Sequence, residues 1–82
     1  MALLPPGARG PKVNRRAWRA LRIERGLTQT GLGRLADVDA SHISRIESGV
    51  RTHPSPKITK RVADALGVEV RDLLAADLEA AR

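Results

Sequence analysis

The sequence predicts an all-α domain, a compact five-helix fold built around one hydrophobic core. Apolar residues recur along most of the chain at the three- and four-residue spacing of amphipathic helices. The stretches with this spacing begin after residues that favour helix starts, such as Asn, Thr and Ser, and most of them end at Gly. A chain of 82 residues has room for one core, and without cysteine neither a disulfide nor a thiolate metal site can brace it.

The first two helices are short and begin at capping residues. Asn14 is expected to cap a helix that reaches Arg25, and Gly26 ends it. Thr28 is expected to cap a second helix that runs to about Ala36. The expected buried positions are Ala17, Trp18 and Leu21 in the first helix and Leu32, Leu35 and Ala36 in the second.

A third helix, expected from Ala40 to Ser48, follows a three-residue break and is closed by Gly49. Asp39 is expected to cap this helix, and the alternative is that its carboxylate reads the amino group of a cytosine. Two short helices joined by so tight a turn cross steeply. The sequence therefore predicts a helix-turn-helix at about residues 28–48.

The third helix has one apolar and one polar face. Ile43 and Ile46 point inward on a helical wheel. The outer face carries Ala40, Ser41, Ser44, Arg45 and Ser48, with His42 at its edge. Because this face is small, polar and basic, the helix is expected to fit a DNA major groove.

The rest of the chain is expected to form two more helices. Ser55 followed by Pro56 predicts the start of a fourth helix, which ends at Gly67. Its expected apolar stripe comprises Ile58, Val62, Ala63 and Leu66. A fifth helix from about Val70 is expected to carry Leu73, Leu74 and Leu78. These three leucines exceed what so small a core needs, so we expect them to contribute to a homodimer interface.

The formal net charge is +6, and the positive charge is concentrated before Gly26. This distribution favours nucleic acid as the partner, with a membrane surface or an acidic protein as alternatives. Residues 1–11 are expected to form a flexible basic N-terminal arm, and residues 12–82 the folded domain. The basic residues of this region, which we expect to track a DNA backbone or enter a minor groove, are Arg9, Lys12, Arg15 and Arg16.

Other kinds of function are disfavoured. Trp18 is the only aromatic residue, which argues against binding of nucleic acid by base stacking. Asp39, Ser41 and His42 do not make a hydrolase triad, because adjacent helical residues point about 100° apart. We expect no enzymatic activity, no metal site and no cofactor. No apolar run approaches the roughly 18 residues of a membrane span, so the expected location is the cytoplasm, at the bacterial nucleoid.

Three motifs in order carry a family resemblance that covers residues 18–74. They are LRIERGLTQ at residues 21–29, SHISRIESG at residues 41–49 and ADALGVEVRDLL at residues 63–74. With these motifs the chain resembles the Cro and phage-repressor type of helix-turn-helix protein, also called the xenobiotic-response-element family. The resemblance implies a lambda-repressor-like DNA-binding domain.

The resemblance also implies roles for individual residues. It implies that Arg22 and Glu47 form a largely buried salt bridge between the first and third helices, which aims Arg22 at the DNA. It implies that Gln29 contacts a phosphate and braces side chains of the recognition helix. Base edges would be read by Ala40, Ser41, His42 and Arg45, and further phosphate contacts would come from Arg51 and His53.

The chain departs from the family pattern at several positions. Gly31 and Gly33 stand where better helix formers are usual, and each costs about 1 kcal/mol relative to alanine. Asp37 replaces a common glycine and is expected to adopt a left-handed conformation. Thr59 stands in place of a core leucine, so the fourth helix is expected to pack in a shifted register around Ile58. The loop from Gly49 to Ser55 is one residue longer than the family norm.

The expected function is that of a transcriptional regulator, a repressor that binds a palindromic operator in double-stranded DNA as a homodimer. No membrane and no small-molecule effector is expected as a partner. The alternative is a protein-interaction adaptor or antitoxin-like module that uses the same fold to hold a partner. An exposed apolar patch on the fifth helix would favour this alternative.

Overall fold

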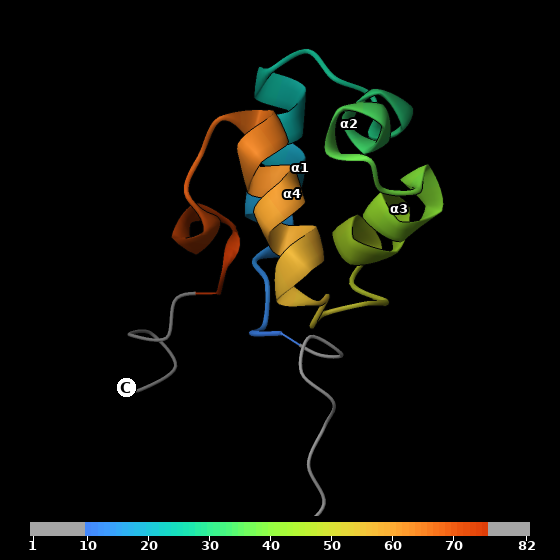
Figure 1. The fold of residues 1–82 in the computed structure, drawn as a ribbon. Coiled ribbons are helices and arrows are strands. Elements are labelled where there is room, and N and C mark those ends of the chain that lie inside the picture. Colours follow the sequence, from blue (N-terminus) through green and yellow to red (C-terminus); the bar gives the residue numbers. More distant parts are fainter. Residues whose placement is uncertain (1–9, 76–82) are drawn as a thin grey trace, which may run out of the picture.

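The computed structural model describes residues 10–75, which form four α-helices followed by a short 3-10 helix (Figure 1). The elements are α1 (Arg15–Glu24), α2 (Gln29–Ala36), α3 (Ala40–Ser48), α4 (Pro56–Leu66) and η1 (Val70–Leu73). The first four predicted helices are confirmed, together with three of their caps. Asn14 accepts from the N–H of Ala17, Thr28 from that of Gly31, and Ser55 from that of Ile58. These bonds satisfy N–H groups that have no partner within a helix.

The predicted fifth helix is wrong, because η1 makes a single 3-10 turn and the chain then becomes extended. Glu69 and Asp72 form a reciprocal capping box around this turn. Leu74 pairs with Val13 as an isolated antiparallel bridge, and the N–H of Ala75 donates to the carbonyl of Lys12 at 2.9 Å. Pairing with the segment before α1 therefore replaces the continued helix that the leucine spacing favours. Residues 10–75 thus fold into four α-helices and a 3-10 turn.

The core is assembled around Trp18, whose side chain is fully buried. Its indole Nε1 donates to the carbonyl of Leu73 at 3.0 Å, which ties α1 to η1. Leu73 is itself fully buried, so the expectation that it contributes to a dimer interface is wrong. Leu74 is half-buried and packs against the same core, and Leu78 lies outside the described residues. The other buried apolar residues are Val13, Leu32, Ala36, Ile43, Ile46, Val62, Ala63 and Leu66.

Two predictions about how the helices pack are also wrong: the burial of Leu35 and the shifted register of α4 around Ile58. Leu35 is 61% exposed, and the buried face of α2 consists of Leu32, Gly33 and Ala36. Thr59 is only 1% exposed, and its hydroxyl donates to the carbonyl of Ser55 at 3.3 Å. This bond satisfies the buried hydroxyl, so α4 keeps its register without a leucine at that position.

The chain before α1 lies beside the loop that follows α3 (Figure 1). The N–H of Val13 donates to the carbonyl of Thr52 at 2.9 Å. Gly10 lies so close to Pro54 that a Cβ there would meet the proline carbonyl oxygen. The division into an arm (residues 1–11) and a domain stays a prediction, since residues 1–9, including Arg9, lie outside the described part.

No helix within residues 10–75 combines the length and the apolar character that a membrane crossing requires.

Candidate nucleic-acid interface

The turn between α2 and α3 fixes the angle at which α3 is presented. Asp37 adopts the left-handed conformation (φ 58°, ψ 48°) that the sequence predicts. The next N–H, of Val38, donates back to the carbonyl of Gly33 at 2.8 Å. A Cβ on Gly33 would lie 2.5 Å from the carbonyl oxygen of Val38. The absence of a side chain at Gly33 therefore allows α2 and the turn to approach this closely.

The outward face of α3 is polar and accessible. Ile43 and Ile46 point into the core and are fully buried. Ser41, Arg45 and Ser48 are exposed on the opposite side, flanked by the half-buried Ala40, Ser44 and His42. Arg45 forms no ion pair within residues 10–75. The structure thus brings the four predicted base-reading residues (Ala40, Ser41, His42 and Arg45) to the outer face of α3 and its edges.

Asp39 stands at the N-cap position of α3, but its side chain makes no capping bond. The main-chain carbonyl of Asp39 accepts from the N–H groups of His42 and Ile43, the third and fourth residues of the helix, at 3.0 and 3.2 Å. The expected capping role of the Asp39 carboxylate is therefore wrong. The residue is exposed, so the carboxylate is accessible from solvent at the start of α3.

His42 lies at the edge of the outer face, and its Nε2 is buried without a hydrogen-bond partner among residues 10–75. Burial lowers the pKa of this imidazole, and the positive charges of Arg51 and Arg45 lower it further, while Asp39 acts in the opposite direction. The lowered pKa favours the neutral imidazole at neutral pH. Burial and the two arginines therefore both disfavour the charged form of His42.

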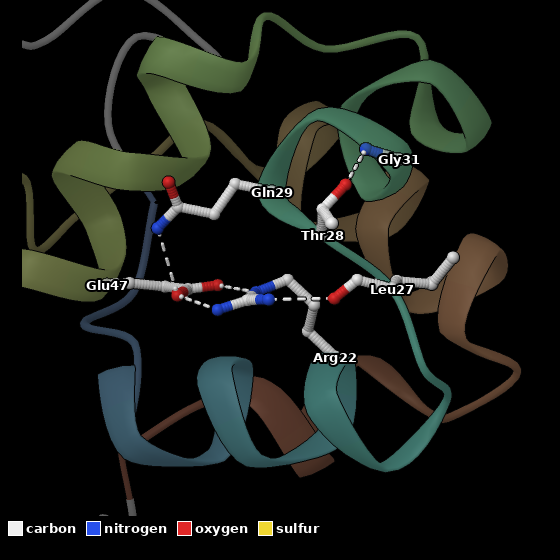
Figure 2. Close-up of polar contacts among 6 residues, drawn as sticks. All are labelled: Arg22, Leu27, Thr28, Gln29, Gly31 and Glu47. Atoms are coloured by element: carbon white, nitrogen blue, oxygen red, sulfur yellow. Dashed lines mark hydrogen bonds and ion pairs between the residues drawn. The ribbon is translucent and has the colours of Figure 1, made fainter.

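A partly buried polar network joins α1, α2 and α3 (Figure 2). The Nε and Nη2 of Arg22 donate to the two carboxylate oxygens of Glu47 at 2.7 and 2.9 Å. Nη1 of Arg22 donates to the carbonyl of Leu27 at 2.7 Å, and the side-chain amide of Gln29 donates to Glu47 at 3.2 Å. The bond to Glu47 raises the pKa of Arg22 against the opposing effect of burial. Gln29 and Arg22 thus hold α3 through the same carboxylate.

This network borders a shallow pocket of about 270 Å³ on the outer flank of α3. Its lining residues are Arg19, Arg22, Gln29, Ser44, Glu47 and Ser48. The pocket places Gln29, predicted to contact a phosphate, beside the half-buried Ser44 and the exposed Ser48 of α3. Arg19 is a cation that the sequence reasoning did not select, although its helical spacing from Arg15 and Arg22 places the three on one edge of α1.

The remaining predicted contact residues lie around the end of α3. Arg51 is exposed, and its N–H donates to the carbonyl of Arg45 at 3.0 Å. His53 is half-buried, with its Nδ1 2.8 Å from the hydroxyl of Thr52. Lys12, Arg15 and Arg16 are all exposed, and a guanidinium N–H of Arg15 donates to the carbonyl of Ser48 at 2.9 Å. Sequence reasoning missed this last contact, since nothing local links residues 33 positions apart.

Comparison with known proteins identifies a family and a relative of this chain. A family model described as helix-turn-helix matches residues 19–73. The HTH-type transcriptional repressor RghR of Bacillus subtilis is 45% identical over 56 residues, a match that covers 68% of this chain and 42% of that relative. The chain therefore spans less than half the length of this curated relative.

Solved structures show the same fold. The N-terminal DNA-binding domain of SinR from Bacillus subtilis superposes with a TM-score of 0.72 at 31% identity, over 76% of this chain and 90% of that one. The restriction-modification controller protein C.AhdI from Aeromonas hydrophila gives 0.69 at 33% identity, over 73% and 89%. SinR has also been solved in complex with DNA, and that structure matches with a TM-score of 0.72 at 31% identity, over 74% of this chain and 100% of that one.

Proposed function

Because the chain belongs to the helix-turn-helix family, we propose that it is a DNA-binding transcriptional regulator whose α3 lies in a major groove. The observation that carries the proposal is the outer face of α3, which is exposed, polar and free of bulky apolar side chains. A helix of this kind can bring its backbone close to base edges. The solved complex of SinR with DNA, which shares this fold, supports the same assignment.

In this proposal the residues divide into two groups. Ser41, His42 and Arg45 read bases together with Ala40, and a bidentate contact from Arg45 to guanine contributes about 1–3 kcal/mol of discrimination. The residues that position the domain on phosphates are Gln29, Arg22, Arg51 and His53. Phosphate contacts fix register and orientation, while base contacts carry sequence information.

The proposal includes a homodimer on a palindromic operator. One recognition helix contacts a single half-site, and two copies can contact successive major grooves about 34 Å apart. The name of RghR supports repression as the regulatory outcome. Since Leu73 belongs to the core, the surface through which two copies meet is not assigned to η1.

The test compares two arginines that lie close together but have different proposed roles. We expect Arg45→Ala to relax sequence preference, whereas Arg51→Ala weakens binding to all sequences alike and reduces the salt dependence. Selection of bound sequences from a random DNA pool, followed by titrations at several salt concentrations, measures both effects. Arg71→Ala is the matched control, because Arg71 is an exposed arginine of η1, which lies away from α3 (Figure 1).

Two outcomes would contradict the proposal. If Arg45→Ala left the selected sequence unchanged, the assignment of the base-reading face would be wrong. If the wild-type chain failed to bind any duplex at about 50 mM salt, where phosphate contacts are strong, the adaptor function would be favoured instead.

A further inference from the structure

We propose that Lys12, Arg15 and Arg51 together hold one phosphate of the DNA backbone at the C-terminal end of α3. The inference rests on the proposed DNA-binding function and adds a site to it. The three cations line one pocket of about 300 Å³, together with Val13, Ile46, Ser48, Gly49 and Thr52. Because a water molecule occupies about 30 Å³ in the liquid, this pocket has room for a phosphate and some of its hydration shell.

The three cations come from separate parts of the chain, and main-chain bonds hold these parts together. The N–H of Val13 donates to the carbonyl of Thr52 at 2.9 Å, which places Lys12 beside Arg51. The carbonyl of Lys12 accepts from the N–H of Ala75, also at 2.9 Å. The backbone at Lys12 is therefore fixed on both sides, so this lysine belongs to the folded domain and not to an arm.

Arg15 has a positioning role that the other two cations lack. The C-terminal end of a helix carries partial negative charge on carbonyls without a partner, which repels a phosphate. A guanidinium N–H of Arg15 donates to one of these carbonyls, that of Ser48, at 2.9 Å. Gly49 permits the approach, because a Cβ there would lie 2.8 Å from the same guanidinium nitrogen. Arg15 thus converts a repulsive helix end into part of a cationic pocket.

The charge in the pocket is uncompensated within the described part of the chain. No carboxylate belongs to the pocket lining. Within residues 10–75, the ion pairs join Arg22 to Glu47, Arg25 to Glu24 and Lys60 to Asp64, so none involves the three cations. Three cations around one pocket repel one another, and a single phosphate relieves that repulsion. The pocket adjoins Ser48 on the outer face of α3, so a phosphate in it lies next to the groove that α3 enters.

The test is whether these cations share one phosphate or contact several. Each phosphate contact contributes about 0.9 to the slope of log affinity against log salt concentration on duplex DNA. We expect Lys12→Gln and Arg51→Gln each to lower this slope by no more than about 0.9, and the double variant to lower it by about 0.9 in total. Binding is measured with a short random-sequence duplex, and Trp18 fluorescence in urea shows that each variant is folded. Arg71→Gln, an exposed arginine of η1 outside the pocket lining, is the control that leaves the slope unchanged.

The outcomes separate this site from the proposed function. A slope that falls by about 1.8 in the double variant would show two independent phosphates and overturn the shared site. An unchanged slope together with normal sequence selection would overturn the site and leave the DNA-binding function intact. If the slopes changed as expected but the wild-type chain selected no preferred sequence, the phosphate site would be supported and the proposed operator binding would be wrong. If inorganic phosphate shifted the amide signals of Gly49 and Thr52 saturably while the DNA slopes stayed unchanged, the ligand would be free phosphate and not DNA.

Discussion

Arg22 and Glu47 form a two-point ion pair in which the arginine side chain is 12% exposed and the glutamate side chain 5% exposed. The Glu47 carboxylate accepts two hydrogen bonds from Arg22 of α1 and one from Gln29 of α2 (Figure 2). Glu47 of α3 therefore joins all three helices. A bidentate pair of this kind fixes orientation as well as distance. The orientation of the recognition helix relative to α1 therefore depends on Glu47.

Glu47→Gln is expected to destabilise the domain by about 3 kcal/mol, because it leaves the Arg22 charge largely buried without a counter-charge. Urea unfolding followed by Trp18 fluorescence measures the effect. Glu24→Gln is the matched control, since Glu24 pairs with Arg25 at the surface and such pairs contribute about 0–1 kcal/mol. Equal losses for the two variants would show that the Arg22–Glu47 pair does not anchor α3.

Leu73→Ala tests the placement of this leucine in the core. Leu73 is fully buried, and its carbonyl accepts the bond from Trp18, so we expect a loss of about 2–5 kcal/mol in the free energy of unfolding. Leu74→Ala, at a half-buried neighbour, is expected to cost less. Sedimentation of both variants, measured alongside the unfolding curves, gives their oligomeric state. A Leu73→Ala chain that kept its stability and changed only its oligomeric state would contradict the core assignment.

The parts of the fold that the sequence predicts correctly depend on local signals. Asn14, Thr28 and Ser55 each satisfy an N–H three residues ahead, so the starts of α1, α2 and α4 follow from short-range hydrogen bonds. The burial of Ile43 and Ile46 follows from helical spacing in the same way. Caps and spacing are properties of neighbouring residues, which is why they can be read without the tertiary structure.

The parts that were predicted wrongly depend on contacts between distant residues. Leu35 fits the apolar spacing of α2, but the buried side of this helix is set by Gly33, which packs against the carbonyl of Val38. Leu74 fits a fifth helix, but it bridges to Val13 at the other end of the chain. The phosphate pocket likewise needs Arg15 to reach Ser48. No local pattern encodes these pairings, because tertiary packing overrides local preference.

Alanine substitutions at the two glycines of α2 are expected to differ by about 1 kcal/mol or more in the free energy of unfolding. Gly31→Ala is expected to gain part of the roughly 1 kcal/mol by which alanine exceeds glycine in helices. Its Cβ would lie 3.2 Å from the hydroxyl of Thr28, a contact that small shifts relieve. Gly33→Ala is expected to lose this gain, because its Cβ would lie 2.5 Å from a backbone carbonyl oxygen, that of Val38, and the turn would have to move. Chemical denaturation of both variants checks the difference, and a larger gain at Gly33 than at Gly31 would contradict the close approach at the turn.

The pH dependence of stability should carry a contribution from His42. Burial lowers the pKa of this imidazole in the folded state, and the charges of Arg51 and Arg45 add to the effect. The unfolded chain binds the proton more readily, with a pKa near 6.5. Protonation therefore favours unfolding, and the contribution of His42 is fully present above about pH 6.5 and is lost as the pH falls through the lower pKa of the folded state.

His42→Gln is expected to reduce the loss of stability between about pH 7.5 and about pH 5.5, since glutamine does not titrate in this range. Urea unfolding curves of both proteins across this range, followed by Trp18 fluorescence, give the two pH profiles. Wild-type curves repeated at high salt separate the causes, because salt screens exposed charges such as Arg51 and Arg45 more than it affects burial. We expect most of the wild-type dependence to persist at high salt, since burial is the first cause of the lowered pKa. Parallel profiles for wild type and His42→Gln would show that the His42 ring is solvated in the folded chain, contrary to the buried Nε2.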